Sequence, residues 1–286
     1  MLIPRPDFEI YGNITRFVIE SQNMLYDWRR PVTPRSIALW FLSTADPEPL
    51  RAGTLIERAA IFGIDSAAVR VALGRLTRDE LARQVERGVY AIGPEAAAVH
   101  AKARSWARVE QTIRPWQGRW VVVQTDHLGR TDRSRLQARE RALRLTGFAV
   151  APSGLWVRPD NLRRDSPALA AGLEALGLDA DALLLAGCAA RPADDAAFRA
   201  LWPVAELEAA YRYWLEEMRA STRRITAAAI PDAARESYLL GQSVLRAINS
   251  DPMLPAELID VGLRGEMVEA MKRYNALALR FWRTLP

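Results

Sequence analysis

Arginines recur in residues 64–93, a stretch that begins like a helix and ends like a hairpin (IDSAAVRVALGRLTRDELARQVERGVYAIG). Asp65 can accept hydrogen bonds from the free amides that start a helix, and Ile64 and Val69 are spaced as a hydrophobic staple around it. Apolar side chains then recur at helical spacing, at Val69, Ala72, Leu73 and Leu76. We therefore expect a helix with one buried face.

The opposite face of this helix carries side chains that suit nucleic acid. It is formed or flanked by small residues and arginines, namely Ala67, Arg70, Val71, Gly74, Arg75 and Arg78. Small residues let a helix approach another surface closely, and guanidinium groups bind phosphate oxygens and guanine edges. Two hydroxyl groups near helix starts and two arginines of the hairpin would add contacts to the phosphate backbone. The predicted DNA-binding residues are Thr54, Ser66, Arg70, Arg75, Arg78, Arg83 and Arg87.

The elements that must position these side chains lie within residues 31–93. The pattern predicts helices over 33–42 and 50–63, the helix that follows Asp65, and strands over 81–85 and 89–92. Thr33 has the chemistry of a helix cap, Gly63 that of a helix end, and Arg87–Gly88 that of a hairpin turn. This order predicts a winged helix-turn-helix domain whose third helix enters the DNA major groove. The alternative is a small helical bundle with a solvated arginine face.

Composition limits the other chemistry that we expect of the chain. Its 286 residues predict two or three domains, and its formal net charge is +5. Arginine supplies all but two of the 39 cations, so position rather than number must identify a phosphate-binding surface. Cys188 is the only cysteine, and neither His100 nor His127 has a cysteine or histidine at ligand spacing. We therefore expect no disulfide, metal, cofactor or catalytic residue.

The termini and the apolar runs bear on location. The chain starts without the pattern of a signal peptide. Its apolar runs are shorter than the roughly 20 residues that a membrane helix needs. We therefore expect a cytoplasmic protein that does not enter a membrane.

Beyond residue 93 the pattern predicts an α+β multidomain protein. Residues 94–115 read as a linker helix, residues 116–192 as a ferredoxin-like domain and residues 193–286 as a helical C-terminal domain; residues 1–30 form an N-terminal extension. The middle domain is predicted from a strand over 119–125, a helix from Asp132 to Gly147, two strands joined at 152–154, a helix capped by Ser166 and a strand over 181–188. C-terminal helices are predicted over 204–220, 237–248 and 266–282, and the two prolines of 249–260 predict a loop.

Aromatic and arginine side chains of the last two domains could line a crevice between them. Such a crevice would stack a ring and pair with phosphates of a small-molecule effector. The candidates are Trp116, Arg119, Trp156, Arg158, Trp202, Tyr211 and Trp214. Packing in a core is the alternative interpretation for each of them.

Three segments together resemble the PaaX-type repressors of phenylacetate catabolism, over roughly residues 33–270. Residues 63–82 (GIDSAAVRVALGRLTRDELA) are similar to that family's glycine turn and recognition helix. The segments WQGRWVVV and GFAVAPSGLWVRP are similar to parts of its middle domain, which has a Cas2-like fold. DPMLPAEL, residues 251–258, is similar to its Asp-Pro-x-Leu-Pro segment.

The resemblance implies a homodimeric transcriptional repressor. It implies that an aryl-CoA or acyl-CoA effector, such as phenylacetyl-CoA, releases the protein from double-stranded operator DNA. Two alternatives stay open. The first, suggested by the Cas2-like fold, is a metal-dependent nuclease in which Asp126 at the end of a strand would be the acidic residue. The second is an architectural DNA binder, which would need no effector.

Overall fold

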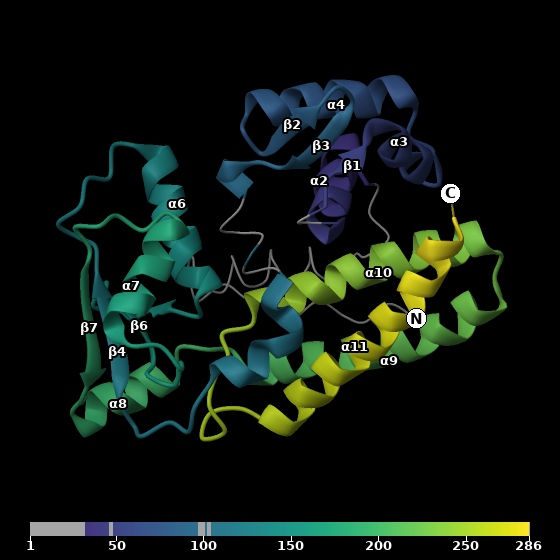
Figure 1. The fold of residues 1–286 in the computed structure, drawn as a ribbon. Coiled ribbons are helices and arrows are strands. Elements are labelled where there is room, and N and C mark those ends of the chain that lie inside the picture. The colour runs from purple at the N-terminus through teal and green to yellow at the C-terminus, as the bar shows by residue number, and fades with distance from the viewer. Residues whose placement is uncertain (1–31, 46–47, 97–100, 102–103, 286) are drawn as a thin grey trace, which may run out of the picture.

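Helices dominate the part of the chain that the structure describes, and the sheets are small. The computed structural model describes residues 32–45, 48–96, 101 and 104–285. Two antiparallel sheets, one of three strands and one of four, lie in separate regions, and the C-terminal region consists of helices and the segments that connect them (Figure 1). The protein is therefore a mixed α+β protein, and the predicted N-terminal extension lies outside the described residues.

The N-terminal region contains three helices and a small sheet. Its elements are α2 (Pro34–Ala45), β1 (Leu50–Arg51), α3 (Ala52–Ala60), α4 (Ser66–Arg78), β2 (Ala82–Glu86) and β3 (Val89–Ile92). The predicted caps are confirmed, because Thr33 Oγ1 accepts from the Ser36 amide at 3.1 Å and Asp65 Oδ1 accepts from the Ala68 amide at 2.8 Å. The boundary of the second helix was predicted wrongly. Residues 50 and 51 form β1, which pairs with β3 in the order β1-β3-β2.

The N-terminal region rests on two C-terminal helices through aromatic contacts. Phe41 of α2 lies edge-on to Trp282, with ring centroids 5.1 Å apart. Phe62 lies 4.8 Å from Tyr238 and stacks at 6.4 Å on Trp282. Both partners belong to the same buried cluster as the apolar face of α4. The three-helix region is thus packed firmly against the C-terminal helices.

The middle region is built on a four-stranded sheet. Its elements are the 3-10 helix η1 (Ser105–Thr112), β4 (Trp120–Gln124), α6 (Arg133–Leu145), β5 (Ala149–Val150), β6 (Trp156–Pro159), α7 (Ser166–Ala175) and β7 (Leu183–Cys188). The strand order is β5-β6-β4-β7, with all neighbours antiparallel. Each predicted strand and helix of 116–192 is present.

Two details of this region differ from the prediction. Asp165, not Ser166, caps α7, because its carboxylate accepts from the Ala168 amide at 2.9 Å and Ser166 is already helical. The predicted linker helix is not continuous to residue 115. Its described end is a 3-10 helix that stops at Thr112, after which Ile113 forms an isolated bridge with Leu162.

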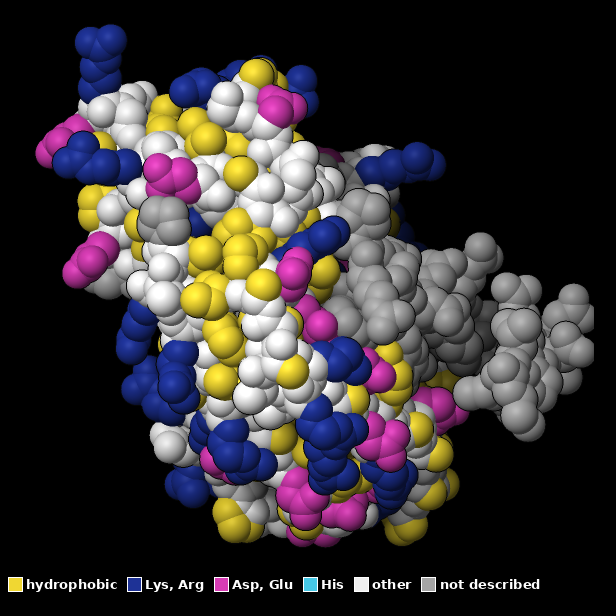
Figure 2. All heavy atoms as spheres, turned by 90° about the vertical axis from the view of Figure 1, so that its right-hand side faces the viewer, with side chains coloured by type: hydrophobic (Ala, Val, Ile, Leu, Met, Phe, Trp, Pro, Cys, Tyr) yellow, Lys and Arg dark blue, Asp and Glu magenta, His cyan; other side chains and the backbone are white. Residues whose placement is uncertain are grey.

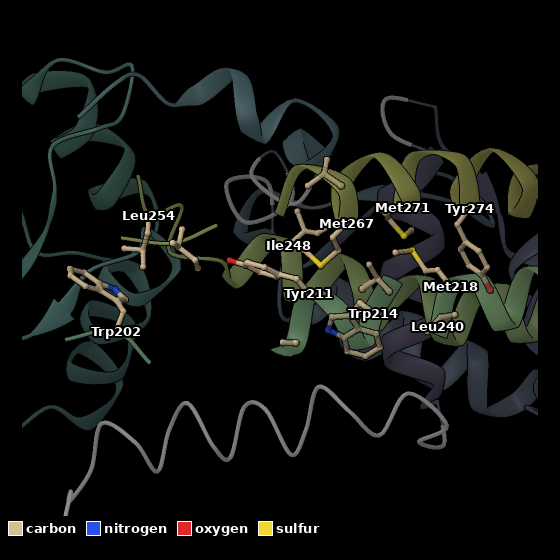
Figure 3. Packing of buried hydrophobic residues seen from close by; sticks show 14 of the residues in the cluster. Trp202, Tyr211, Trp214, Met218, Leu240, Ile248, Leu254, Met267, Met271 and Tyr274 are labelled. Atoms are coloured by element: carbon tan, nitrogen blue, oxygen red, sulfur yellow. The ribbon is translucent and has the colours of Figure 1, made fainter. Parts of the chain in front are cut away.

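The C-terminal region is a stack of long helices. Its elements are α8 (Pro192–Arg199), α9 (Val204–Ala227), α10 (Ile230–Ser250) and α11 (Val261–Thr284). The prediction missed α8 and gave the long helices too short. Their shared core is rich in methionine, and Figure 3 shows Met218 and Met271 facing each other between α9 and α11. Residues 251–260 are non-helical, as predicted, but Asp251–Pro255 are all buried.

Candidate nucleic-acid interface and ligand cavity

The exposed face of α4 is open and basic. We call the exposed arginines of α4 and of the β2–β3 hairpin the basic surface: Arg70, Arg75, Arg78, Arg83 and Arg87. Val71 is 54% exposed between them, and nothing lies within 4 Å of where a side chain on Gly74 would begin. In Figure 1 α4 runs along the upper edge of the molecule, and Figure 2 shows Lys and Arg side chains projecting from that end.

The charge of this surface is little compensated by the described residues. Asp79 is the acidic group that pairs there, with Arg35 at 2.9 Å and Arg78 at 3.6 Å. The hydrogen bond from Arg35 holds the pKa of Asp79 below its usual value. Within the described part of the chain no ion pair joins an acid to Arg70, Arg75 or to either hairpin arginine. These guanidinium groups are therefore available to phosphates or bases.

Two local features hold the basic surface in place. The buried face of α4 consists of the four residues predicted from spacing, Val69, Ala72, Leu73 and Leu76. At the hairpin tip Gly88 adopts a φ of 75°, and its carbonyl accepts from the Ala52 amide at 2.8 Å. This bond ties the turn to the start of α3, so Arg87 is fixed beside it. Ser66 is exposed at the first turn of α4, and Thr54 is half-buried in the first turn of α3.

The structure does not bring the predicted effector residues into one pocket. Four of them, Trp116, Trp202, Tyr211 and Trp214, belong to the C-terminal core cluster, and Trp156 belongs to the core of the middle sheet. Trp202 stacks on Trp120 with ring centroids 6.2 Å apart. Arg119 is exposed, and only its backbone meets one of these rings, because its carbonyl accepts from Trp116 Nε1. The expectation of an aromatic slot is therefore corrected, because these rings are already packed against protein.

A cavity does lie between the middle and C-terminal regions, but other residues line it. Its volume is about 380 Å³. It opens between η1, α6, α7 and the end of α10, and its apolar lining includes Val109, Leu145, Leu162, Leu169, Leu173 and Ile248. Its polar side chains include Arg158, which was predicted, together with Arg164 and Asp251, which were not. Small-molecule sites occupy roughly 300–1,000 Å³, so this cavity falls in their lower range.

Arg158 is the unusual group of this cavity. It is 2% exposed, and its guanidinium donates to the carbonyls of Thr146 and Pro159 and, at 2.9 Å, to Asn161 Oδ1. Burial lowers the pKa of Arg158 to about 9. All three acceptors are neutral, so no bond of this set compensates the charge.

A buried polar network joins the cavity to the segment between α10 and α11. Asn161 Nδ2 donates to the Met253 carbonyl at 2.8 Å, and Asp251 Oδ1 accepts from the Met253 amide at 2.7 Å. The Tyr211 hydroxyl donates to Asp251, and Figure 3 shows it pointing toward the segment that carries Leu254. Burial raises the pKa of both Asp251 and Tyr211.

A second buried arginine closes this network. Arg264 of α11 is 1% exposed, and it donates to both carboxylate oxygens of Glu110 on η1 and to the Leu254 carbonyl at 2.7 Å. Gly147 approaches the same segment so closely that a Cβ would lie 2.4 Å from the Pro252 carbonyl oxygen. The Asp-Pro-Met-Leu-Pro segment is therefore the point where the middle region, η1 and the C-terminal helices meet.

The described residues offer neither a metal cluster nor a membrane-spanning helix. They contain no group of three or more His, Cys, Asp or Glu that could hold a metal ion. Asp126 lies against the turn at Gly154, where a Cβ would be 3.0 Å from its carboxylate oxygen. None of the described helices combines the length and the hydropathy that crossing a membrane requires.

Comparisons with known proteins bear on the fold. No protein-family model matches the chain, and neither does any curated protein. Among solved structures the chain is similar to the uncharacterized protein Rv0674 from Mycobacterium tuberculosis, at 26% identity and a TM-score of 0.53. The match covers 86% of this chain and 99% of that chain, so it extends over most of the mixed α+β arrangement described above.

Proposed function

We propose that the protein is a DNA-binding transcriptional repressor. The observation that carries the proposal is the open face of α4, where Arg70 and Arg75 have no acidic partner among the described residues, followed at once by a basic hairpin. The order α2, β1, α3, α4, β2, β3 supports a winged helix-turn-helix in which α4 enters the major groove and the hairpin contacts phosphates. Arg70 and Arg75 would then meet base edges, and Arg83 and Arg87 phosphates.

The topology of the middle region supports the same assignment. Its elements follow the order strand, helix, strand, strand, helix, strand, and its strands lie in the order β5-β6-β4-β7. This is the ferredoxin-like arrangement that the resemblance to PaaX-type repressors implies for a Cas2-like domain. Among the described residues nothing beside Asp126 favours the nuclease alternative, and we do not propose it.

Repression of a specific site requires more contacts than one such domain makes. One recognition helix reads only a few base pairs, so we propose a twofold homodimer on a palindromic operator. Half-sites one helical turn apart would place the two α4 helices about 34–36 Å apart. The protein would act on DNA in the cytoplasm.

Release from DNA is proposed to follow effector binding. The resemblance implies an aryl-CoA or acyl-CoA thioester, with phenylacetyl-CoA as its reference. Helix α10 offers a physical route, since Ile248 at its end lines the cavity and Tyr238 near its start packs on Phe41 and Phe62 of the N-terminal region. An effector must bind the DNA-free arrangement more tightly, because equal affinity for both arrangements shifts nothing.

Selection of bound duplexes from a random DNA pool, followed by anisotropy titration, tests the proposal. A palindromic consensus bound by a dimer, measured by light scattering, is the expected result, and phenylacetyl-CoA should weaken that binding. Recovery of no consensus, together with affinity equal for all duplexes, would contradict a sequence-specific repressor. If a consensus is found but no acyl-CoA or aryl-CoA weakens binding to it, the protein binds DNA specifically and the proposed effector is rejected.

A further inference from the structure

Among the described residues no carboxylate forms an ion pair with the buried guanidinium of Arg158. A guanidinium has five N–H donors, and the described residues accept from Arg158 through three neutral oxygens. The adjacent Asp160 favours the charged form of Arg158 without bonding to it, since its carboxylate pairs with Arg114 at 2.8 Å and accepts from the Gly187 amide at 3.0 Å. A charge buried without a partner is costly unless something else pairs with it.

A second cation stands at the same cavity. Arg164 lines it, and a Cβ on Gly172 of α7 would lie 2.9 Å from its Nη1. The carboxylate in the lining, Asp251, has its oxygens engaged by the Tyr211 hydroxyl and the Met253 amide, with Arg264 at 3.9 Å. Among the described residues of the lining, the two cations therefore have no acid that is free to pair with them.

The rest of the lining sets the shape and character of a ligand. Leucines of α6 and α7, Leu162 and Ile248 make most of the wall apolar. A volume of about 380 Å³ holds a phenyl or medium-chain alkyl group together with a carboxylate, and it is too small for a whole coenzyme A. This wall therefore matches a ligand with one anionic end and one compact apolar end.

We propose that this cavity binds a small apolar carboxylic acid, whose carboxylate pairs with Arg158 and Arg164 and whose aryl or alkyl group lies against the leucines. Such a ligand would supply the charge that Arg158 lacks. It would also contact the end of α10, where Ile248 lines the cavity. Its binding is independent of DNA. A role as an effector rests on the proposed function and would put the free acid in the place that the resemblance gives to a CoA thioester.

Calorimetry on the full chain without DNA tests the site. The probes are octanoate and 4-phenylbutyrate, each with its uncharged amide as the matched ligand control. We expect both acids to bind, with the amides about tenfold or more weaker, which is the scale of one lost charge-assisted hydrogen bond. Octanoyl-CoA is a third arm, and we expect it to bind no more tightly than octanoate.

Variants locate the binding. Arg158→Gln should weaken octanoate about tenfold or more, whereas Arg163→Gln, an exposed neighbour outside this cavity, should leave its affinity unchanged. Gly172→Leu fills the cavity from a helical position and displaces only the flexible end of Arg164. It should abolish binding without lowering the melting temperature, so the test stands even if Arg158→Gln folds poorly.

Several outcomes would overturn the inference. One is equal affinity for the acids and their amides, and another is no binding of either acid. A third is that Gly172→Leu binds octanoate as tightly as wild type. The last is that octanoyl-CoA binds more tightly than octanoate and that Arg158→Gln does not weaken it. None of these bears on whether the basic surface binds DNA. A protein that binds octanoate but selects no DNA would keep the site and reject the repressor.

Discussion

Arginine serves two opposite purposes in two regions of this protein. On the basic surface the guanidinium groups are exposed, and apart from Arg78, which pairs with Asp79, they lack acidic partners among the described residues. They therefore cost little stability and are free to act on a partner. At the junction between the middle and C-terminal regions, Arg264 is 1% exposed and its charge is paired with the Glu110 carboxylate at 2.9 Å. The proposed function of the basic surface thus depends on guanidinium groups that no carboxylate pairs with. The structure of the junction depends on a buried guanidinium whose charge is paired.

Removing a charge should therefore have opposite consequences in the two regions. Arg264→Met leaves Glu110 and the buried Asp251 without their cation, and breaking a buried pair in this way costs about 3–5 kcal/mol. Arg75→Ala should change the free energy of unfolding by less than about 0.5 kcal/mol, since its side chain is exposed. Denaturant titration followed by tryptophan fluorescence measures both. Equal losses in the two variants would break the comparison.

The packing of the junction can be tested apart from its charges. Gly147→Ala would place a Cβ 2.4 Å from the Pro252 carbonyl oxygen, at a residue whose φ is 84°. Gly118 is the matched control, because its φ is 68° and nothing lies within 4 Å of its Cβ position. Gly147→Ala and Gly118→Ala both place an alanine in the left-handed region, which costs about 1–2 kcal/mol of stability. Gly147→Ala should lose about 1–3 kcal/mol more from the clash, and equal melting temperatures would refute the tight contact.

Two carboxylates, one from each region, should respond to pH in opposite directions. The pKa of Asp79 is lowered, so its contribution to stability is present above its unfolded value, near pH 4, and is lost as pH falls below that. The pKa of Asp251 is raised, so the folded protein gains from it as pH falls through that raised value toward about pH 4.

Melting temperatures of wild type, Asp79→Asn and Asp251→Asn between about pH 7 and pH 3 test these signs. The advantage of the wild type should shrink toward acid pH against the first variant and grow against the second. Slopes of the same sign would show that one of the two environments is misassigned.

The sequence predicted local structure more accurately than it predicted which residues are buried. Asp65, Thr33 and the spacing on α4 act locally, so cap and period could be read directly, and they were confirmed. Cap position was wrong at Ser166 because Asp165, just before it, competes for the same amide.

Long-range contacts explain the remaining errors. Trp120 donates from Nε1 to Asp195 at 2.9 Å and stacks on Trp202, across about 75 residues of chain, so the filled aromatic cluster left no local signal. Helix α8 did leave one, Pro192 at its start with two aspartates in its first turn, and the prediction missed it. Two prolines predicted a loop at 249–260 correctly, but not that Asp251–Pro255 is buried. The cavity likewise depends on residues from four elements, and only Arg158 among the predicted pocket residues lines it.

The central claim is that the unpaired arginines of the basic surface bind DNA, and its most direct test is affinity for a selected duplex measured across a series of salt concentrations. Arg70→Ala and Arg75→Ala should each cost about 1–3 kcal/mol on the selected duplex and little on a scrambled one. Arg87→Ala should weaken both duplexes alike and reduce the salt slope by about 1. Arg219→Ala, an exposed arginine on α9, should behave as wild type. Wild-type affinity and salt slope in all three variants of the basic surface would contradict the account.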